Sequence, residues 1–387
     1  MRLIHTSDWH LGRRLHGEDL HQAHEQFLRW LVALAVRENA DAVLVSGDVY
    51  DRAQPGADAV RLLDSALAQF VTAGIPLVVS AGNHDSAVRL QYGGQVLAAT
   101  GVHLRTTVEQ VLEPVLLADE HGALGVYAIP YVLPDAVTQA LGVARSHAAV
   151  LAELADRIRL DATARGLSRV VLMAHAFVVG GVASQSEREI RVGGVGEVPA
   201  DLLDGFSYVA LGHLHGPQLV GIAGSGTTVS YSGSPLAFSF SERDHVKSVT
   251  VVEIDADGQV ELRRVPTPVP RALRQVRGRL ADLLAEGAQQ RDDLAQAYVK
   301  VVLTDPGRVA SPMEQLREVW PHTLVLEFDP DGAQQRASGL TRATEASDPV
   351  EIAAQFVSLV SGQLPTPGQR EVLAQAVAAC RAGEVGA

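Results

Sequence analysis

The sequence has little of what secreted or membrane proteins need. It contains one cysteine, Cys380, which excludes an internal disulfide bond and fits the reducing cytoplasm. The longest mostly apolar stretch, residues 170–183, is too short to span a bilayer and contains His175. Met1 leads directly into a short apolar run without a basic segment or a long apolar segment, so we expect no signal peptide. These absences favour a cytoplasmic protein.

Positive charge is also scarce. The chain of 387 residues has 32 Lys and Arg against 45 Asp and Glu, and its formal net charge is -13. Proteins that bind nucleic acid by themselves usually neutralise phosphates with clustered Lys and Arg. The acidic balance therefore counts against a stand-alone, high-affinity DNA-binding protein, unless bound divalent cations, a basic patch or a basic partner offset it.

Alternating short apolar runs and amphipathic stretches fill the first half of the chain. This rhythm predicts an α/β core with helices covering a sheet. The expected strands are residues 3–7, 42–46, 75–80, 170–174 and 207–211, and the expected helices are 21–37, 57–73, 87–99 and a long helical region, 137–165. Further β-structure at 229–231, 248–254 and 260–265 predicts a second sheet stacked on the first.

The length exceeds one small core and predicts two or three folding units. The Pro-rich stretch 265–270 is typical of a linker, and the polar stretch 332–347 predicts a second one. Between them we expect a small α+β domain with the order helix 273–285, strand 298–303, helix 312–319 and strand 323–328. Two helices, 350–361 and 367–381, are expected in the tail. The predicted division is therefore 1–265, 271–331 and 348–387.

Four short segments contain the residue types of metal chemistry, each at the end of a predicted strand. They are Asp8-Trp9-His10, Gly47-Asp48-Val49-Tyr50-Asp51, Gly82-Asn83-His84-Asp85 and Gly212-His213-Leu214-His215. His175 follows another predicted strand. Ligands of open α/β sheets bind at this edge. Divalent metals that activate water are held by carboxylate oxygens, imidazole nitrogens and amide oxygens, and a central carboxylate such as Asp48 can bridge two ions roughly 3.5–4 Å apart.

Each segment alone is also explained by an ordinary surface turn. Four such segments, each at a strand end, are hard to obtain by chance, so we favour a metal site over turns. The remaining histidines need no special role. We expect His21 and His24 to be solvated on a helix, and His5 to lie in a strand beside the core.

The pattern resembles the calcineurin-like metallophosphoesterase superfamily and, within it, the SbcD family of nuclease subunits. The resemblance is carried by Ser7-Asp8-Trp9-His10-Leu11-Gly12, Gly82-Asn83-His84-Asp85-Ser86, Leu211-Gly212-His213-Leu214-His215 and Ser232-Gly233-Ser234-Pro235, continued by Ser239-Phe240-Ser241-Glu242. It is strong through residue 254 and weaker beyond. It implies a four-layer αββα sandwich as the nuclease domain (1–265), an α+β capping domain (271–331) and a helical tail (348–387). The Gly-rich segment 180–196 is similar to a family loop that is either a lip over the site or a plain loop.

The resemblance also implies a role for each candidate residue. One metal ion is held by Asp8, His10, Asp48 and His215, and the other by Asp48, Asn83, His175 and His213. His84 faces the scissile phosphate and protonates the leaving oxygen, and Asp85 orients His84. Mn²⁺ is the expected metal, although the ligand types alone leave Mg²⁺, Fe²⁺ and Zn²⁺ open.

The implied activity is that of a DNA nuclease in replication, recombination and repair. It comprises 3′–5′ double-strand exonuclease and endonuclease or hairpin cleavage at DNA ends in the nucleoid. The implied partners are DNA, an SbcC-type ATPase whose coiled-coil root binds the tail helices, and a second copy of the chain, paired through helices 57–73 and 87–99 within a heterotetramer. Four arginines near the metal segments either contact DNA phosphates or make ordinary salt bridges: Arg13, Arg14, Arg52 and Arg89.

Two other functions compete with this one. The same fold supports small-molecule phosphodiesterases and phosphoprotein phosphatases, but such enzymes need neither the α+β domain nor the tail helices. A non-catalytic scaffold is the third alternative, and the complete set of candidate ligands together with His84 counts against it.

Overall fold

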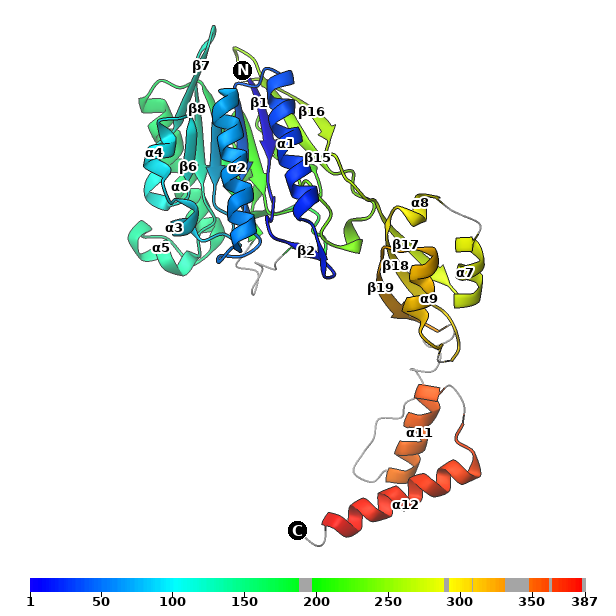
Figure 1. Cartoon of the computed structure of the whole chain (residues 1–387). Coiled ribbons are helices and arrows are strands. Elements are labelled where there is room, and N and C mark those ends of the chain that lie inside the picture. Colours follow the sequence, from blue (N-terminus) through cyan, green and yellow to red (C-terminus); the bar gives the residue numbers. More distant parts are fainter. Residues whose placement is uncertain (188–196, 289–291, 308, 331–347, 362–363, 385–387) are drawn as a thin grey trace. The chain divides into compact units, whose positions relative to one another are not determined.

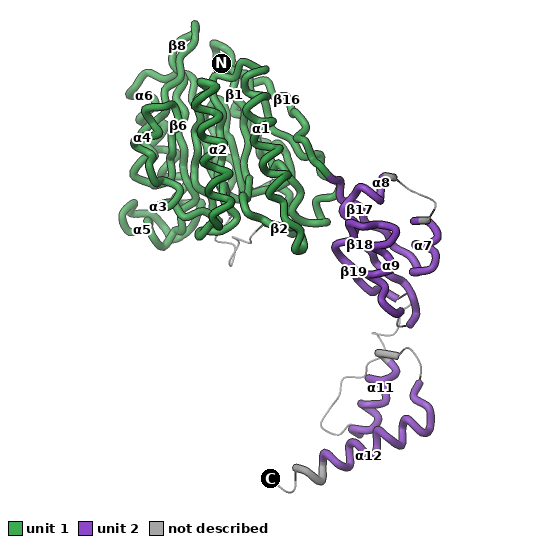
Figure 2. The backbone as a smooth tube through the Cα atoms, viewed as in Figure 1, with its two compact units in different colours: residues 1–270 green, residues 271–387 purple. Residues whose placement is uncertain are grey.

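The computed structural model describes residues 1–187, 197–288, 292–307, 309–330, 348–361 and 364–384. The chain divides into two compact units, residues 1–270 and 271–387 (Figure 2). The linker predicted at 332–347 lies outside the described residues. Among the helices that are described, none combines the length and the apolarity needed to cross a bilayer.

Two sheets form the centre of the first unit, and each has six strands within the described residues. The first has the spatial order β16 (Val260–Pro266), β15 (Ser248–Ile254), β1 (Arg2–Thr6), β4 (Ala42–Ser46), β5 (Leu77–Ser80) and β6 (Val102–Arg105). The second has the order β13 (Gln218–Val220), β14 (Thr228–Tyr231), β12 (Tyr208–Gly212), β9 (Arg169–His175), β8 (Gly122–Ile129) and β7 (Val115–Asp119). Within each sheet, the central strands run parallel to their neighbours.

Helices cover the outer faces of both sheets (Figure 1). Those of the first unit are α1 (His21–Arg37), α2 (Ala57–Ala73), α3 (Ala87–Leu90), α4 (Gly94–Ala98), α5 (Pro134–Leu141) and α6 (His147–Ala164). The 3-10 helices are η1 (Val108–Gln110), η2 (Ala200–Leu203) and η3 (Phe240–Glu242). Two short ribbons pair β2 (Arg14–Leu15) with β3 (Glu18–Asp19) and β10 (Phe177–Val178) with β11 (Glu197–Val198).

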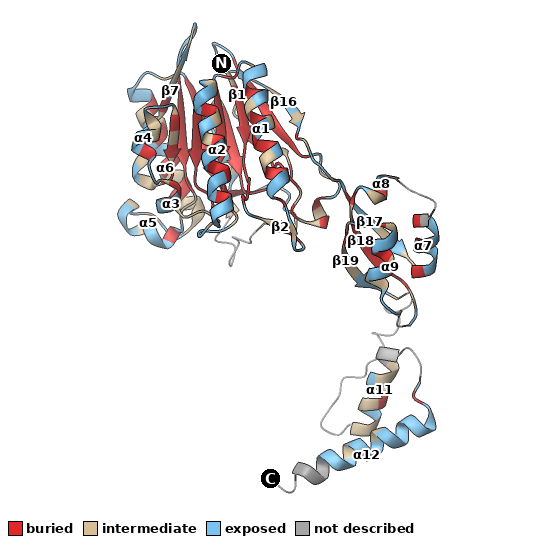
Figure 3. Ribbon diagram, viewed as in Figure 1, coloured by how far each residue is buried: buried red, intermediate tan, exposed pale blue. Residues whose placement is uncertain are grey.

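Strand β4 shows how the sequence builds these layers. All five of its residues are buried, as expected for a strand covered on both faces. Its alternate side chains belong to different clusters: Val43 and Val45 pack with α1 and α2, whereas Leu44 packs between the two sheets. Helix α6 covers the far side of the second sheet through a third cluster that includes Leu154. The burial pattern in Figure 3 follows this four-layer αββα arrangement, and the predicted fold class is confirmed.

Several elements differ from the predictions. Strands β15 and β16 extend the first sheet by pairing antiparallel to β1 and to each other, and they do not belong to the second sheet. The hairpin β7–β8 was missed, and the long helix expected at 137–165 is two helices, α5 and α6. The helix expected at 87–99 is interrupted near Gly93, whose φ of 75° is left-handed.

The second unit contains a parallel three-stranded sheet and two tail helices among its described residues. Its elements are β17 (Leu273–Gly278), α7 (Leu280–Ala288), α8 (Asp292–Ala295), β18 (Tyr298–Leu303), α9 (Pro312–Val319), β19 (Thr323–Phe328), α11 (Pro349–Ser361) and α12 (Pro367–Glu384). The helix predicted at 273–285 is wrong in its first half, because residues 273–278 pair with β18 instead. A separate core that includes Val301, Leu316 and Trp320 stabilises this sheet.

Candidate metal centre

The candidate ligands converge at one edge of the paired sheets. Strand β1 ends just before Asp8, β4 before Asp48 and β5 before Asn83. In the second sheet β9 ends at His175, and β12 ends just before His213. Because the carboxyl ends of parallel strands lie on the same side of a sheet, the loops that follow them share one region of space.

The backbone at this edge adopts conformations that side chains rarely accept. Asp8, His10, Asp48 and His213 have φ angles of 52°, 46°, 51° and 105°. Left-handed backbone at a non-glycine residue costs on the order of 1–3 kcal/mol and gathers at functional sites. The loops are held there by hydrogen bonds, including one from the Asp8 amide to the Gly47 carbonyl at 3.0 Å. Four of the seven predicted ligands therefore have a strained backbone conformation of the kind that is common at functional sites.

One half of the centre is formed by Asp8, His10 and His215. Nε2 of His10 lies 3.2 Å from Nε2 of His215. One ligand atom from each of the three residues lies within 4.8 Å of the other two. The Asp8 carboxylate accepts hydrogen bonds from the Ser7 hydroxyl at 2.5 Å and from the His213 amide at 3.0 Å. All three side chains are buried, with at most 1% exposure.

The other half is formed by Asn83, His175 and His213. The side-chain oxygen Oδ1 of Asn83 lies 3.0 Å from Nε2 of His175 and 3.2 Å from Nδ1 of His213. The imidazole of His175 is oriented from behind, because its Nδ1 lies 2.9 Å from the Ser46 carbonyl oxygen. One amide oxygen and two imidazole nitrogens thus face one point.

Asp48 lies between the two halves. Its Oδ2 is 3.6 Å from Nε2 of His10 and 3.4 Å from Nε2 of His175. Burial by itself raises the pKa of Asp48, but His175, His10 and His84 outweigh burial and hold that pKa well below its usual range. Asp48 is therefore the anion that both halves share.

The pKa values of Asp8 and His175 are both raised, in contrast to that of Asp48. Burial raises the pKa of Asp8 to about 6, against the influence of His175 and His215. Burial lowers the pKa of His175, but the carboxylates of Asp48 and Asp8 outweigh it and raise that pKa to about 9. One oxygen of Asp8 and one of Asp48 lie within 4.8 Å of each other. Two buried carboxylates at this separation are costly, and bound divalent cations would relieve that cost.

These donors fit divalent cations. Adjacent ligands at right angles around an ion with bonds of about 2.1 Å lie about 3 Å apart. The spacings of 3.2 Å between His10 and His215 and of 3.0 Å between Asn83 and His175 are close to that value. The donor set contains only nitrogen and oxygen, so hard and borderline divalent metals match it.

His84 and Asp85 lie beside the centre and contact the loop that carries Asp48. The His84 amide donates to Oδ1 of Asp48 at 2.8 Å, and its ring Nδ1 lies 2.8 Å from the Asp51 carbonyl oxygen. Asp85 accepts hydrogen bonds from the amides of Val49, Tyr50 and Gly82 at 3.1, 2.9 and 2.9 Å. The Asp51 carbonyl oxygen therefore contacts the His84 ring, and Asp51 is the last residue of the segment 47–51 that the sequence analysis named without a role for this residue. The orienting role of Asp85 stays a prediction.

Asp85 ties two ligand loops together through those three amides. Burial and the nearby Asp48 carboxylate raise the pKa of Asp85 to about 7, although the amides act in the opposite direction. A Cβ at position 82 would lie 2.1 Å from Oδ1 of Asp48, so only glycine allows the 82–85 loop to approach this closely.

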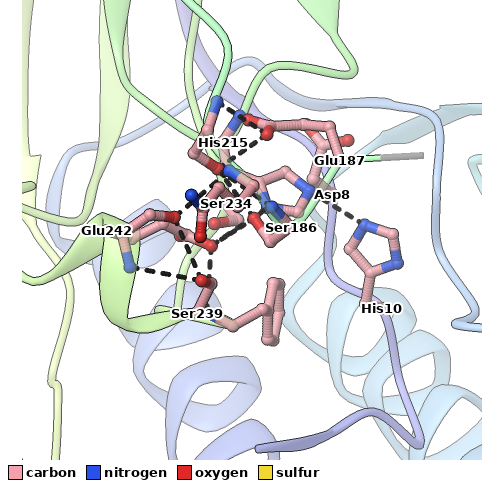
Figure 4. A network of polar contacts seen from close by, with 12 residues as sticks. Asp8, His10, Ser186, Glu187, His215, Ser234, Ser239 and Glu242 are labelled. Carbon is pink, nitrogen blue, oxygen red and sulfur yellow. Dashed lines mark hydrogen bonds and ion pairs between the residues drawn. The ribbon is translucent and has the colours of Figure 1, made fainter. Parts of the chain in front are cut away.

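Three further polar residues contact the centre, and sequence reasoning assigned them no role. Ser186, Glu242 and Lys247 are buried around His215 (Figure 4, which labels the first two and His215). Glu242 belongs to the motif Ser239–Glu242 that carried part of the resemblance, and its place in that motif was a usable signal. The rest of the segment that contains Ser186, residues 188–196, lies outside the described residues.

His24 also departs from its prediction. It was expected to be solvated on its helix, but it is fully buried and its ring packs near Phe238, with centroids 6.1 Å apart. Phe238 in turn borders His10 and His215 at 5.2 and 5.5 Å. His5 lies in β1 as expected, buried and 2.8 Å from the Tyr208 hydroxyl.

The fold and this centre define a class of protein. Residues 1–217, more than half of the chain, match the family model described as calcineurin-like phosphoesterase. Residues 269–360 match another, described as type 5 capsule protein repressor C-terminal domain. Members of the first family use divalent metals to hydrolyse phosphoesters, which the cluster of His and Asp residues suits.

A curated relative narrows the class. The SbcD subunit of the nuclease SbcCD from Staphylococcus saprophyticus is 30% identical over 336 residues, which cover 84% of this chain and 84% of the relative. The chain therefore belongs to the SbcD family of calcineurin-like phosphoesterases, as its motifs suggested, and it is a phosphodiester hydrolase.

Two solved structures are similar at low sequence identity. A dimetal phosphatase from Danio rerio is 13% identical with a TM-score of 0.42, and the match covers 69% of this chain and 97% of that one. A Thermus thermophilus protein is 12% identical with a TM-score of 0.38, and the match covers 68% of this chain and 98% of that one.

Proposed function

We propose that this chain is a DNA nuclease subunit that cleaves phosphodiester bonds with two divalent cations, Mn²⁺ by preference. The observation that carries the proposal is the position of Asp48, whose Oδ2 lies within 3.6 Å of both His10 and His175. A shared carboxylate between two donor sets is what a two-metal phosphoesterase needs. The relationship to a nuclease subunit over 84% of both chains supports DNA as the substrate.

The ligand sets follow from the two halves of the centre. One ion would be held by Asp8, His10, Asp48 and His215. The other would be held by Asp48, Asn83, His175 and His213. When bound, such a pair supplies a nucleophilic water at neutral pH and neutralises charge on the nonbridging phosphate oxygens.

His84 would act on the leaving group. His84 is buried, with 7% exposure, and its ring centroid lies 4.6 Å from that of His10, so its ring borders the centre. The Asp51 carbonyl oxygen lies 2.8 Å from Nδ1 and orients the ring. In the proposed role, Nε2 faces the scissile phosphate. In this role Nε2 gives a proton to the departing 3′ or 5′ oxygen, which contributes about 10²–10⁴-fold to the rate.

We propose that the exposed arginines beside the metal centre, Arg14 and Arg52, contact DNA phosphates. The side chains of Arg14 and Arg52 are 63% and 83% exposed and can reach phosphates. Arg13 is already engaged, because it makes an ion pair with Asp51 at 2.9 Å and is 19% exposed. With a net charge of -13, we expect weak DNA affinity in the absence of a partner.

We also propose an SbcC-type ATPase and a second copy of the chain as partners, acting in the cytoplasm at DNA ends. The tail, residues 348–387, would bind the ATPase, since Ile352 and Phe356 of α11 are 39% and 61% exposed. The second copy would meet α2, α3 and α4, since Val88 of α3 and Tyr92, between α3 and α4, are more than 80% exposed. A cavity of about 760 Å³ lined by Val60, Leu67, Val96 and other residues of these helices supports that surface.

One assay tests the central proposal against its alternatives. Purified protein is incubated with Mn²⁺ and either labelled double-stranded DNA or bis-p-nitrophenyl phosphate. We expect cleavage of both, from 3′ ends and at hairpins in the DNA. Cleavage of the small ester alone would indicate a small-molecule phosphodiesterase or phosphatase. No cleavage of either, even with the ATPase and ATP, would indicate a scaffold.

A truncation tests the partner proposal. Removal of residues 347–387 should spare cleavage of the small ester, because the metal centre lies in unit 1. It should abolish capture by an SbcC-type ATPase, and a truncated chain that is still captured would overturn the proposed role of the tail. Sedimentation of the full chain tests pairing, and a monomer at every concentration would overturn it.

A further inference from the structure

A buried ion pair lies directly behind the candidate ligand His215. Glu242 and Lys247 are 1% and 4% exposed and bond to each other. The Lys247 ammonium also donates to the His215 carbonyl oxygen and to the Ser234 hydroxyl, both at 2.9 Å. Burying two charges is costly and a buried ion pair adds little net stability, so we looked for another role of this pair in its contacts with His215.

The pair reaches the His215 ring through a serine. The Ser186 hydroxyl lies 2.7 Å from Nδ1 of His215 and donates to the Glu242 carboxylate (Figure 4). Oε1 of Glu242 also lies 3.4 Å from the same nitrogen. The opposite nitrogen, Nε2, faces His10 at 3.2 Å. One side of the imidazole is therefore held from behind, and the other is presented to the metal centre.

The segment that supplies the serine also holds the backbone of His215. The Glu187 carboxylate accepts from the His215 amide at 2.8 Å through Oε1 and from the Ser184 amide at 2.7 Å through Oε2. Arg13 donates to the Ser186 carbonyl at 3.1 Å. Residues 184–187 thus contact His215 at both its ring and its main chain.

We propose that Glu242 is a positioning residue for His215, acting through Ser186. In this arrangement Nδ1 carries the proton and donates it to the Ser186 oxygen, and Ser186 donates to Glu242. Nε2 is then left with its lone pair toward the cation, and the ion pair with Lys247 holds the Glu242 carboxylate in place. The inference rests on the proposed function, in which His215 holds one of two cations. An acceptor behind a metal-bound histidine fixes its tautomer and raises its basicity, and its loss typically weakens metal binding about 10- to 100-fold.

The test uses Glu242→Gln and Ser186→Ala in the full chain. Ser186→Ala leaves the Glu242–Lys247 pair intact, so it provides a variant whose folding is not at risk. Mn²⁺ binding is measured by calorimetry and by electron paramagnetic resonance, and folding by thermal unfolding without metal. Glu253→Gln is the matched control, because that carboxylate is 49% exposed on β15 and pairs with Arg2 at the surface.

We expect two Mn²⁺ sites in the wild type, with one of them weakened about 10- to 100-fold in Glu242→Gln and by less in Ser186→Ala. Activity lost at low Mn²⁺ should return at saturating Mn²⁺, which a purely structural defect would not allow. Two unchanged sites in both variants, or equal weakening of both sites, would overturn the inference and leave the proposed function standing. A wild type that binds no Mn²⁺ and cleaves neither substrate would overturn the proposed function itself.

Discussion

The two halves of the metal centre are held in different ways. Behind His215 stand side chains: the Ser186 hydroxyl and the buried ion pair of Glu242 and Lys247. Behind His175 stands the backbone, because its Nδ1 lies 2.9 Å from the Ser46 carbonyl at the end of β4. The first half can therefore be altered by exchanging one side chain, whereas the second depends on how closely the two sheets approach each other.

The largest expected effect comes from the residue common to both halves. Asp48→Ala removes the shared carboxylate and should lower cleavage by about 10³-fold or more, since metal-based charge stabilisation is worth several kcal/mol. Calorimetry should show weak binding of both Mn²⁺ ions, not of one. Asp58→Asn, at an exposed position of α2, serves as the control. Loss of a single ion in Asp48→Ala would contradict the bridging role.

The next effect separates chemistry from metal binding. His84→Asn should lower the cleavage rate about 10²–10⁴-fold by removing the general acid, with both Mn²⁺ affinities unchanged. A p-nitrophenyl ester should be less affected than DNA, because its leaving group needs little protonation. A nitrogen of His84 also lies within 4.8 Å of donor atoms of His10 and Asp48. A fall in the Mn²⁺ affinity of His84→Asn would therefore indicate that His84 is a metal ligand and not only a general acid.

A third prediction tests the half that is held by backbone. A Cβ at Gly212 would lie 1.8 Å from the Ser46 oxygen and 2.9 Å from Nδ1 of His175. Gly212→Ala should push the sheets apart, cost about 1–3 kcal/mol of stability and weaken one Mn²⁺ site. Thermal unfolding and calorimetry measure the two effects. Gly221→Ala meets open space and should change neither. A stable Gly212→Ala variant with two unchanged Mn²⁺ sites would contradict the claim that the His175 half depends on the close approach of the two sheets.

The smallest effect concerns stability and the core behind the His215 half. Burial lowers the pKa of His24 to about 4. Below pH 6.5 the unfolded chain binds a proton at this residue that the folded chain takes up only near pH 4, so stability falls as pH falls through that window. In the wild type, His24 should lower the free energy of unfolding by up to about 1.4 kcal/mol for each pH unit in this window, and His24→Phe should remove that contribution.

Urea unfolding with a metal chelator at several pH values measures this slope. His21→Phe lies on the exposed side of the same helix and should keep the wild-type slope. An unchanged slope in His24→Phe would show that His24 is not buried as a neutral ring.

The local pattern of apolar residues was sufficient to predict the elements that form the core of the first sheet and its helices. The strand predicted at 42–46 matches β4, and the helices predicted at 21–37 and 57–73 match α1 and α2. The same pattern failed for segments whose structure depends on pairing with another strand. Residues 273–278 were expected to begin a helix, yet they form β17 and pair with β18. Strands β15 and β16 joined the first sheet because β1 had an unpaired edge.

The sequence by itself determined which donors exist and at which strand ends they stand, because apolar runs and the polar residues after them are local features. Only the tertiary structure decided that Asp51 holds His84, that Glu242 and Lys247 stand behind His215, and that His24 is buried. The ring of His215 is held by residues 27–29 positions away, and that of His175 by one 129 positions away. Contacts of this kind depend on how loops and sheets pack, and neither helical nor strand periodicity encodes that packing.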